Sequence, residues 1–273
     1  MMTDTSGDAA GRQRVTCEVA DGVAQVRLNR PDKMNALDPA LFEALVDVGS
    51  ALIDRPDVSA VVIAGEGRAF CAGLDMGQFE LMQGGAADVV ADRERLGAAT
   101  ALGQQAVHVW SLVPVPVIAA IHGVAFGGGL QVALGADIRI AAPDTKLSVM
   151  EIVWGLIPDM TGTQVLPELV GRDVAKELVF TGRRISGSDA AAIGLVTRTD
   201  DEPLSAATAL ATEIAGNSRG ALVEAKALLE LAGRVDLAAG LDAEQVAIRK
   251  LIGSPEQIEV VRRRTEEMAR RRR

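Results

Sequence analysis

The stretch Ile118-Ala-Ala-Ile-His-Gly-Val-Ala-Phe-Gly-Gly-Gly-Leu-Gln131 decides the fold, because an apolar strand runs into three consecutive glycines that open an apolar helix. Glycine lets the main chain come close to a ligand. The first turn of a helix adds unsatisfied N–H donors and a partial positive charge. We therefore expect this junction to hold a phosphate or a developing oxyanion. For a glycine triplet taken alone, the alternative is a purely structural tight turn.

The glycine spacing excludes the two common nucleotide motifs. It is not G-x-G-x-x-G, and the chain contains no G-x-x-x-x-G-K-[ST]. A second junction of the same kind lies upstream, where an apolar strand over residues 58–65 is followed by a small-residue loop over 66–75 that leads into another helix. One chain therefore carries two strand–glycine–helix junctions.

Together with residues 28–37, these two junctions resemble the crotonase superfamily, also called the enoyl-CoA hydratase/isomerase family. The resemblance continues through residues 143–163, 178–182 and 188–196. It implies an α/β fold built as a spiral of ββα units, followed by a helical C-terminal region that forms trimers, often paired as hexamers. The substrate implied is an acyl-CoA thioester, with coenzyme A entering as part of the substrate and not as a cofactor.

Length and composition agree with a globular protein that has one substantial core. The chain has 273 residues, of which 48% are hydrophobic. Its long apolar run at 113–120 is interrupted by Pro114 and Pro116 and is too short to span a membrane. Residues 1–13 are polar and small, which indicates a disordered extension without a signal peptide. We therefore expect a cytoplasmic protein without membrane partners.

The charge is unevenly distributed. The formal net charge is −9, but residues 258–273 hold seven arginines and three glutamates, which leaves −13 on the remainder. An acidic body argues against broad nucleic-acid binding, and an aromatic content of 3% without tyrosine argues against a base-stacking surface. The basic end is interpreted as a solvated helix terminus. The alternative is attraction for the phosphates of a nucleotide-bearing substrate.

The two cysteines and two histidines predict no metal, disulfide framework or Cys-His catalytic pair. Cys17 lies on a predicted strand and Cys71 in the second glycine loop, far from any Cys/His spacing that metals require. We interpret Cys71 as a small residue chosen for its volume. His108 and His122 lie in no recognisable nucleophile motif. No cofactor is expected.

Strand and helix signals alternate as in α/β proteins. Residues 14–29 alternate apolar and polar around Asp21-Gly22, which predicts a hairpin. Asp38 and Pro39 supply the N-cap and first residue of a helix. Strands are predicted at 58–65, 116–121 and 136–141, and helices at 38–54, 88–112 and 128–135. Four further helices are predicted at 204–216, 219–231, 238–252 and 255–270. We divide the chain into an extension (1–13), a core with the acyl-CoA site (14–199) and a helical trimerisation region (200–273).

The resemblance assigns two backbone donors to an oxyanion hole. In the family, one N–H follows the Ala-Gly pair of the second loop and the other belongs to the central glycine of the triplet. Those positions are Leu74 and Gly128 in this chain. Segments matching the CoA-contacting parts of the family contain Lys33, Ala36, Leu37, Ala72, Gly73, Asp75, Met76 and Gly127. As alternatives, Lys33 is an exposed turn residue and Asp75 caps the helix that follows it.

The carboxylates depart from the pattern of the family's hydratases, which pair two glutamates. The first of these positions is Gln131 here, and the second is retained as Glu151. An amide forms hydrogen bonds but cannot exchange a proton near neutral pH. For Gln131, substrate contact and a core hydrogen bond are both open. Apolar neighbours predict that Glu151 is partly buried, which would raise the pKa of its carboxyl.

Asp159 supplies another carboxylate, eight residues after Glu151. This pair resembles the dienoyl-CoA isomerase branch, although that branch has an aspartate at position 131. Asp159 also resembles the nucleophile of the 4-chlorobenzoyl-CoA dehalogenase branch, which has a tryptophan at position 151 and ranks lower. The alternative is that Asp159 caps a helix starting near Thr161.

These residues predict an enoyl-CoA or dienoyl-CoA isomerase. Glu151 would remove a proton, Leu74 and Gly128 would stabilise the dienolate, and Glu151 or Asp159 would return the proton. The alternatives are an enoyl-CoA hydratase, which adds water to a 2-enoyl-CoA, and a catalytically inactive CoA-binding subunit. RNA binding through the basic terminus is a weaker possibility.

Overall fold

The computed structural model describes residues 13–83 and 92–271 and has a six-stranded sheet at its centre. The strand order is β1-β2-β3-β6-β8-β11, and only β1 is antiparallel to its neighbour. Asp21 and Gly22 both have positive φ, which suits the tight turn of the predicted hairpin. The strands are β1 (Val15–Ala20), β2 (Val23–Leu28), β3 (Ala60–Gly65), β6 (Val117–Ile121), β8 (Ile138–Ala141) and β11 (Arg198–Thr199).

A second, three-stranded sheet has the order β10-β9-β7. Its strands are β7 (Val124–Phe126), β9 (Lys146–Ser148) and β10 (Ile185–Ser186). The consecutive strands β6 and β7 lie in different sheets, and so do β8 and β9. Each pair thus adds one strand to each sheet before the chain enters the next helix, α4 (Gly128–Leu134) or α5 (Gly162–Val170). The predicted α/β spiral of ββα units is confirmed.

Helix α1 (Pro39–Ile53) begins as the sequence predicts. The Asp38 side chain accepts a hydrogen bond from the Leu41 N–H, and proline occupies the first helical position. The buried face of α1 packs against α3 (Leu102–Leu112). A Cβ on Gly49 would lie 2.6 Å from both methyl groups of Val109, so glycine permits this close helix contact.

The helix predicted over 88–112 is wrong for residues 92–101. Residues 92–101 form a hairpin of β4 (Asp92–Leu96) and β5 (Ala99–Ala101), and only α3 is helical; residues 88–91 lie outside the described residues. Gly97 has a φ of +58°, which suits the turn. The amide of Gln105 donates to the carbonyls of Glu94 and Ala99, so tertiary hydrogen bonds override local helix propensity.

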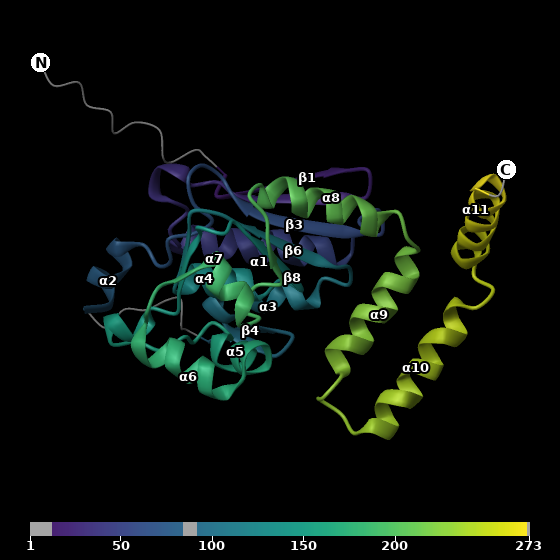
Figure 1. Ribbon diagram of the computed structural model, residues 1–273. Coiled ribbons are helices and arrows are strands. Elements are labelled where there is room, and N and C mark those ends of the chain that lie inside the picture. The colour runs from purple at the N-terminus through teal and green to yellow at the C-terminus, as the bar shows by residue number, and fades with distance from the viewer. Residues whose placement is uncertain (1–12, 84–91, 272–273) are drawn as a thin grey trace, which may run out of the picture.

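The helical region begins at residue 203 and contains α8 (Pro203–Ala215), α9 (Arg219–Leu231), α10 (Leu237–Leu251) and α11 (Pro255–Arg271). Helix α8 lies on the sheet, where Ala207 and Ala211 join a buried cluster with Val62 and Ile118. Helix α9 follows α8, and helices α10 and α11 extend away from the core (Figure 1). Within the described ranges, no helix is long and apolar enough to cross a membrane.

Helix α9 is held to the core by a buried ammonium group. Lys226 is 8% exposed, and its Nζ donates to the Asp137 carboxylate at 2.7 Å and to the carbonyls of Trp110 and Val115 at 3.2 Å. A buried charge is tolerated when its hydrogen bonds are satisfied. Arg219 adds a second attachment by donating to the Val58 carbonyl at 2.7 Å.

We expect Lys226→Met to lower the free energy of unfolding by about 2 kcal/mol, because Asp137 and two carbonyls lose their shared donor. Lys250→Met is the matched control, since the exposed Lys250 ammonium pairs with Glu224 at the surface. It should change stability by less than about 0.5 kcal/mol. Urea denaturation measures both values. Equal losses would contradict the anchoring role of Lys226.

Candidate active site

A cavity of about 340 Å³ lies beside the N-terminus of α4 and collects most of the expected site residues. Lys33, Ala36 and Asp75 are not part of its lining. The expected residues that line it are Leu37, Ala72, Gly73, Leu74, Met76, Gly127, Gly128, Gln131, Glu151 and Asp159. The two glycine junctions and the two carboxylates, far apart in sequence, thus meet at one cavity.

The loop over residues 71–75 passes between two other segments and is held by backbone hydrogen bonds on both sides. On one side, Leu37 N–H donates to the Gly73 carbonyl at 2.8 Å and Asp75 N–H donates to the Leu37 carbonyl at 2.9 Å. On the other side, Phe126 N–H of β7 donates to the Cys71 carbonyl at 3.1 Å. This double pairing fixes the loop against the start of α4.

Two glycines permit the close approach of the loop and the helix. A Cβ on Gly73, whose φ is +90°, would lie 2.6 Å from the Phe126 carbonyl oxygen. A Cβ on Gly129 would lie 2.5 Å from the Cys71 carbonyl oxygen. Any other residue at either position would separate the two segments.

This geometry leaves the N–H groups of Leu74 and Gly128 available to the cavity. The Gly73 carbonyl and the Asp75 N–H both point toward Leu37, with which they form hydrogen bonds. In extended backbone the N–H of the intervening Leu74 therefore points away from Leu37. Gly128 is the first residue of α4, where N–H groups have no partner within the helix. In the described part of the chain, neither N–H makes a hydrogen bond.

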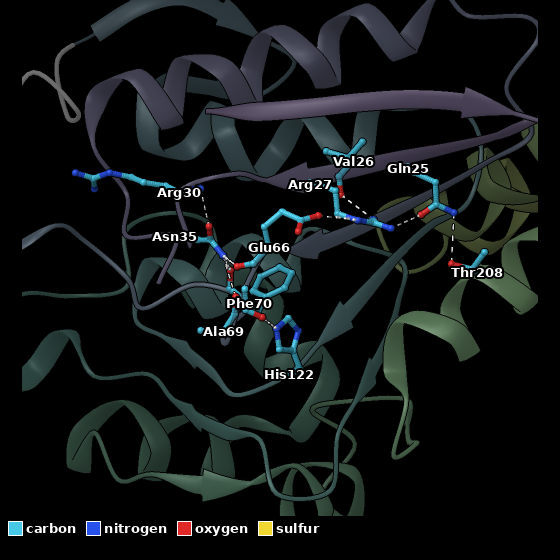
Figure 2. Close-up of polar contacts among 11 residues, drawn as sticks. Gln25, Val26, Arg27, Arg30, Asn35, Glu66, Ala69, Phe70, His122 and Thr208 are labelled. Atoms are coloured by element: carbon cyan, nitrogen blue, oxygen red, sulfur yellow. Dashed lines mark hydrogen bonds and ion pairs between the residues drawn. The ribbon is translucent and has the colours of Figure 1, made fainter. Parts of the chain in front are cut away.

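Asn35 is a structural residue that the sequence analysis did not single out. It is fully buried, its Oδ1 accepts from Arg30 N–H, and its Nδ2 donates to the carbonyls of Glu66, Ala69 and Phe70 at 2.9–3.1 Å (Figure 2). It therefore ties the 30–37 turn to the segment before the 71–75 loop. An asparagine among apolar residues is the available signal, and its φ of +55° is one that asparagine tolerates.

Asp75 and Lys33 occupy the outer edge of the site. The Asp75 side chain accepts from Gly77 N–H at 2.9 Å at the start of α2 (Met76–Gln83) and pairs with Arg30. The interpretation of Asp75 as a helix cap is therefore confirmed. Lys33 ends the short 3-10 helix η1 (Pro31–Lys33) and is exposed, as its turn interpretation predicts.

Gln131 is held on both ends of its amide. Its Oε1 accepts from the backbone N–H groups of Met160 and Gly162 at 2.9 and 3.0 Å, while its Nε2 donates to Glu151 Oε1 at 2.5 Å. Gln131 is 1% exposed, so the core hydrogen bond is the interpretation that the structure supports. Because the oxygen is fixed by two backbone donors, the NH₂ group must face Glu151.

Asp159 does not cap α5, so the capping alternative is wrong. The N-cap residue is Thr161, with a φ of +71° and no side-chain capping bond, and Gln131 satisfies the Gly162 N–H instead. Asp159 is exposed and lines the cavity. The surrounding protein nevertheless displaces enough water to raise the pKa of its carboxyl.

Glu151, the first residue of the 3-10 helix η3 (Glu151–Trp154), is 9% exposed, which confirms the predicted burial. Burial raises the pKa of its carboxyl and the nearby Asp159 charge adds to this, while the hydrogen bond from Gln131 opposes it. Glu151 Oε2 is buried and has no hydrogen-bond partner within the described residues. A buried carboxylate oxygen without a partner, beside a cavity, is suited to contact a ligand.

Cys71 is a buried thiol of raised pKa. Its thiol is buried and donates to the Asn35 carbonyl at 3.0 Å, and burial raises its pKa to about 12. A thiol of this kind is not a nucleophile near neutral pH, so the volume-filling interpretation holds. In the described ranges, no group of three or more His, Cys, Asp or Glu side chains could hold a metal ion.

The remaining cavity wall is apolar and was not predicted in detail. The rings of Phe79 and Trp154 stack with centroids 4.6 Å apart and an interplanar angle of 31°. Phe79 belongs to α2 and Trp154 to η3, so the two meet only in the folded chain. The other apolar side chains are Leu37, Phe42, Leu74, Met76, Met82, Phe126, Met150, Leu156, Ile157 and Met160.

A ββα spiral with two glycine junctions over an apolar cavity defines a protein of the crotonase class. The sequence model described as enoyl-CoA hydratase/isomerase matches residues 18–266. The chain therefore belongs to the enoyl-CoA hydratase/isomerase family.

Relatives within the family carry different activity names. Enoyl-CoA hydratase domain-containing protein 2, mitochondrial, of Bos taurus is 34% identical over 92% of this chain and 85% of its own. A peroxisomal Delta(3,5)-Delta(2,4)-dienoyl-CoA isomerase of Arabidopsis thaliana is 34% identical over 79% of this chain and 80% of its own. The crystal structure of a putative enoyl-CoA hydratase from Streptomyces coelicolor A3(2) superposes with a TM-score of 0.84 at 31% identity, covering 97% of this chain and 96% of the other.

We expect Glu151→Gln to raise the melting temperature at pH 8. Because the pKa of Glu151 is raised in the folded state, this group contributes its full stability at low pH, and that contribution is lost as the pH rises through the raised pKa. Glutamine imitates the protonated form at every pH and can still accept from Gln131. Thermal unfolding from pH 4 to pH 8 should show that the melting temperature of Glu151→Gln exceeds that of the wild type by a margin that grows with pH.

The control for this comparison is Glu168→Gln, which neutralises an exposed carboxylate on α5. The difference in melting temperature between Glu168→Gln and the wild type should not grow comparably with pH. If Glu151→Gln melted no higher than the wild type at pH 8, the buried Glu151 charge would not destabilise the folded protein, and this would contradict the prediction.

Proposed function

We propose that the protein is an enoyl-CoA or dienoyl-CoA isomerase that moves a double bond along an acyl thioester by proton transfer. The observation that carries the proposal is the position of Glu151 Oε2, which is buried at the cavity lined by Leu74 and Gly128 and has no hydrogen-bond partner among the described residues. The elevated pKa of Glu151 brings its carboxyl closer to the working range of a general base.

In the proposed reaction, the thioester oxygen accepts hydrogen bonds from the N–H groups of Leu74 and Gly128. Glu151 Oε2 removes a proton from the acyl chain, and the resulting dienolate is stabilised by the two donors. The proton then returns at another carbon. Glu151 alone suffices for a 3-enoyl to 2-enoyl shift, whereas Asp159 supplies the second carboxyl for a 3,5-dienoyl to 2,4-dienoyl shift.

The hydratase alternative is disfavoured by Gln131. Hydration by two carboxylates needs a second group that exchanges a proton, and an amide does not. The Gln131 oxygen is occupied by Met160 and Gly162, and its nitrogen faces Glu151.

The substrate proposed is a CoA thioester with an apolar acyl chain. Among the residues that line the cavity in the described ranges, only Glu151 and Asp159 carry a charge. An apolar chain is stabilised by such walls, whereas a polar chain terminus would lose its hydration there. The exposed Lys33 would supply a positive charge for a CoA phosphate. The reaction needs no cofactor and no nucleic-acid partner.

We propose that the protein assembles as a homotrimer or as a hexamer of two trimers. The helices α9, α10 and α11 extend from the core (Figure 1). They expose large apolar side chains, including Leu229, Leu237 and Ile252, which are 70–77% exposed in the single chain. Apolar surface of this kind marks an interaction site.

Two carboxylate variants separate the isomerase reactions. We expect Glu151→Gln to lower kcat by about a hundredfold to ten-thousandfold on both 3-enoyl-CoA and 3,5-dienoyl-CoA, since it removes the base. Asp159→Asn should impair only the dienoyl reaction. Product mass and ultraviolet absorbance follow both reactions, with crotonyl-CoA as the test for hydration. Efficient water addition to crotonyl-CoA, or full dienoyl turnover by Asp159→Asn, would contradict the proposal.

The oxyanion hole is tested by Gly128→Pro, which removes the N–H at the first position of α4, where helices accept proline. We expect kcat to fall by about a hundredfold to a thousandfold. Gly128→Ala is the matched control, because its Cβ meets the same flexible ends of Leu37 and Met160 but it retains the N–H.

The assembly state of these two variants is measured by light scattering. Both should keep the mass of three or six chains, so that lost activity reports on the donor and not on assembly. Similar activity of Gly128→Pro and Gly128→Ala would argue against the Gly128 donor. A single-chain mass for the wild type would contradict the proposed assembly.

A further inference from the structure

A two-carboxylate isomerase must restore its protons after each turnover. When Glu151 takes a proton from one carbon and Asp159 delivers a proton to another, Glu151 ends protonated and Asp159 ends ionised. One proton must then leave Glu151 and one must reach Asp159, with no net consumption. The inference below therefore rests on the proposed dienoyl-CoA isomerase function.

A second cavity, of about 570 Å³, meets Asp159 from outside the acyl cavity. Among the described residues, Asp159 is the one that the linings of these two cavities share. The polar residues of the second lining are Gln104, His108, Ser111, Asp137, Arg139, Asp159, Thr161, Thr163, Gln164, Glu168, Glu230 and Arg234. A space of this size with polar walls can hold water.

The segment 159–162 contributes to both walls and is fixed in place. Met160 lines the acyl cavity and Thr161 lines the second cavity, while the left-handed φ of Thr161 turns the chain between them. Gln131 Oε1 holds the segment by accepting from the N–H groups of Met160 and Gly162. Asp159 therefore stands at the junction of two spaces that its neighbours separate.

His108 of the second cavity is not free to carry the proton. Its Nε2 lies 3.2 Å from the Ala98 N–H, which donates to it, so Nδ1 carries the hydrogen and faces Ser111 Oγ at 3.0 Å. The Ser111 hydroxyl donates in turn to the His108 carbonyl. Burial lowers the pKa of His108, which favours this neutral ring.

Apart from Glu168, which is exposed, the other charged groups of the lining are engaged with protein partners. Glu230 pairs with Arg234, and Asp137 accepts from Lys226. Arg139 donates to the carbonyls of Ala136 and Leu195. Water is thus the carrier that this lining admits.

We propose that the second cavity is the proton-exchange route of Asp159, open to solvent while an acyl chain fills the first cavity. A solvent proton passes through water in the second cavity to the Asp159 carboxylate and forms its O–H bond. Glu151 releases its proton to solvent when the product leaves the acyl cavity. The acyl chain and the proton therefore reach the two sides of Asp159 by separate openings.

The route is tested first by thiol accessibility. In a Cys17→Ser background, Asp159→Cys introduces a thiol that is alkylated by iodoacetamide, with and without saturating octanoyl-CoA, which cannot isomerise. The remaining Cys71 is buried with a pKa of about 12, so the Cys17→Ser protein is the blank. We expect octanoyl-CoA to slow alkylation by less than about twofold, because the second opening remains. Full protection by octanoyl-CoA would overturn the proposal.

Adding Gln164→Trp to this protein should abolish alkylation only when octanoyl-CoA is bound. Gln164 is exposed on α5 and lines the second cavity, so an indole there obstructs it without disturbing the core. Lys176→Trp is the matched control, because Lys176 is exposed on α6 (Arg172–Thr181) and does not line the second cavity. Equal alkylation with both tryptophans would overturn the proposal.

Turnover supplies the functional readout. In otherwise wild-type protein, Gln164→Trp should lower kcat on 3,5-dienoyl-CoA by about tenfold or more with KM unchanged. Lys176→Trp should retain wild-type kcat. An unchanged kcat for Gln164→Trp would overturn the route while leaving the isomerase proposal standing. Absence of dienoyl-CoA turnover by the wild-type protein would overturn both.

Discussion

The site depends on one constraint, the passage of the 71–75 loop between the 34–37 turn and strand β7. Backbone hydrogen bonds hold the loop on both sides, and glycine at 73 and 129 removes the Cβ atoms that would force it away from α4. The same constraint leaves the Leu74 and Gly128 N–H groups without hydrogen-bond partners in the part of the chain that the structure describes. Because the donors are fixed before a ligand arrives, little reorganisation is needed when charge develops on a bound oxygen.

Gln131 connects the geometry of the site to its chemistry. Its amide oxygen accepts from the backbone N–H groups of residues 160 and 162, and its nitrogen donates to Glu151 Oε1. One side chain thus supports the start of α5 and holds Glu151, whose Oε2 has no hydrogen-bond partner within the described residues. A carboxylate at position 131 would meet Glu151 as a like charge at short distance, and the pair would have to share a proton. Gln131 therefore holds Glu151 by a hydrogen bond without itself exchanging protons.

The sequence predictions are correct where an element depends on residues close together in the chain, and wrong where it depends on residues far apart. The hairpin at 21–22 and the start of α1 are local, and turn chemistry and capping predict them. The helix expected over 92–101 is a hairpin, because Gln105 satisfies carbonyls there that a local pattern cannot reveal. The capping role considered for Asp159 is wrong, since Gln131 reaches the start of α5 from another helix.

The sequence by itself determined the family, the first hairpin, the central strands near 58–65, 116–121 and 136–141, the C-terminal helices and the residue types at the two glycine junctions, because these follow from short motifs and periodicity. The tertiary structure alone decided how Gln131, Asn35 and the stacked pair of Phe79 and Trp154 are used. It also decided that Asp159 faces two cavities. The physical reason is that a side chain's partners, its burial and the pKa that burial sets depend on segments far apart in the chain.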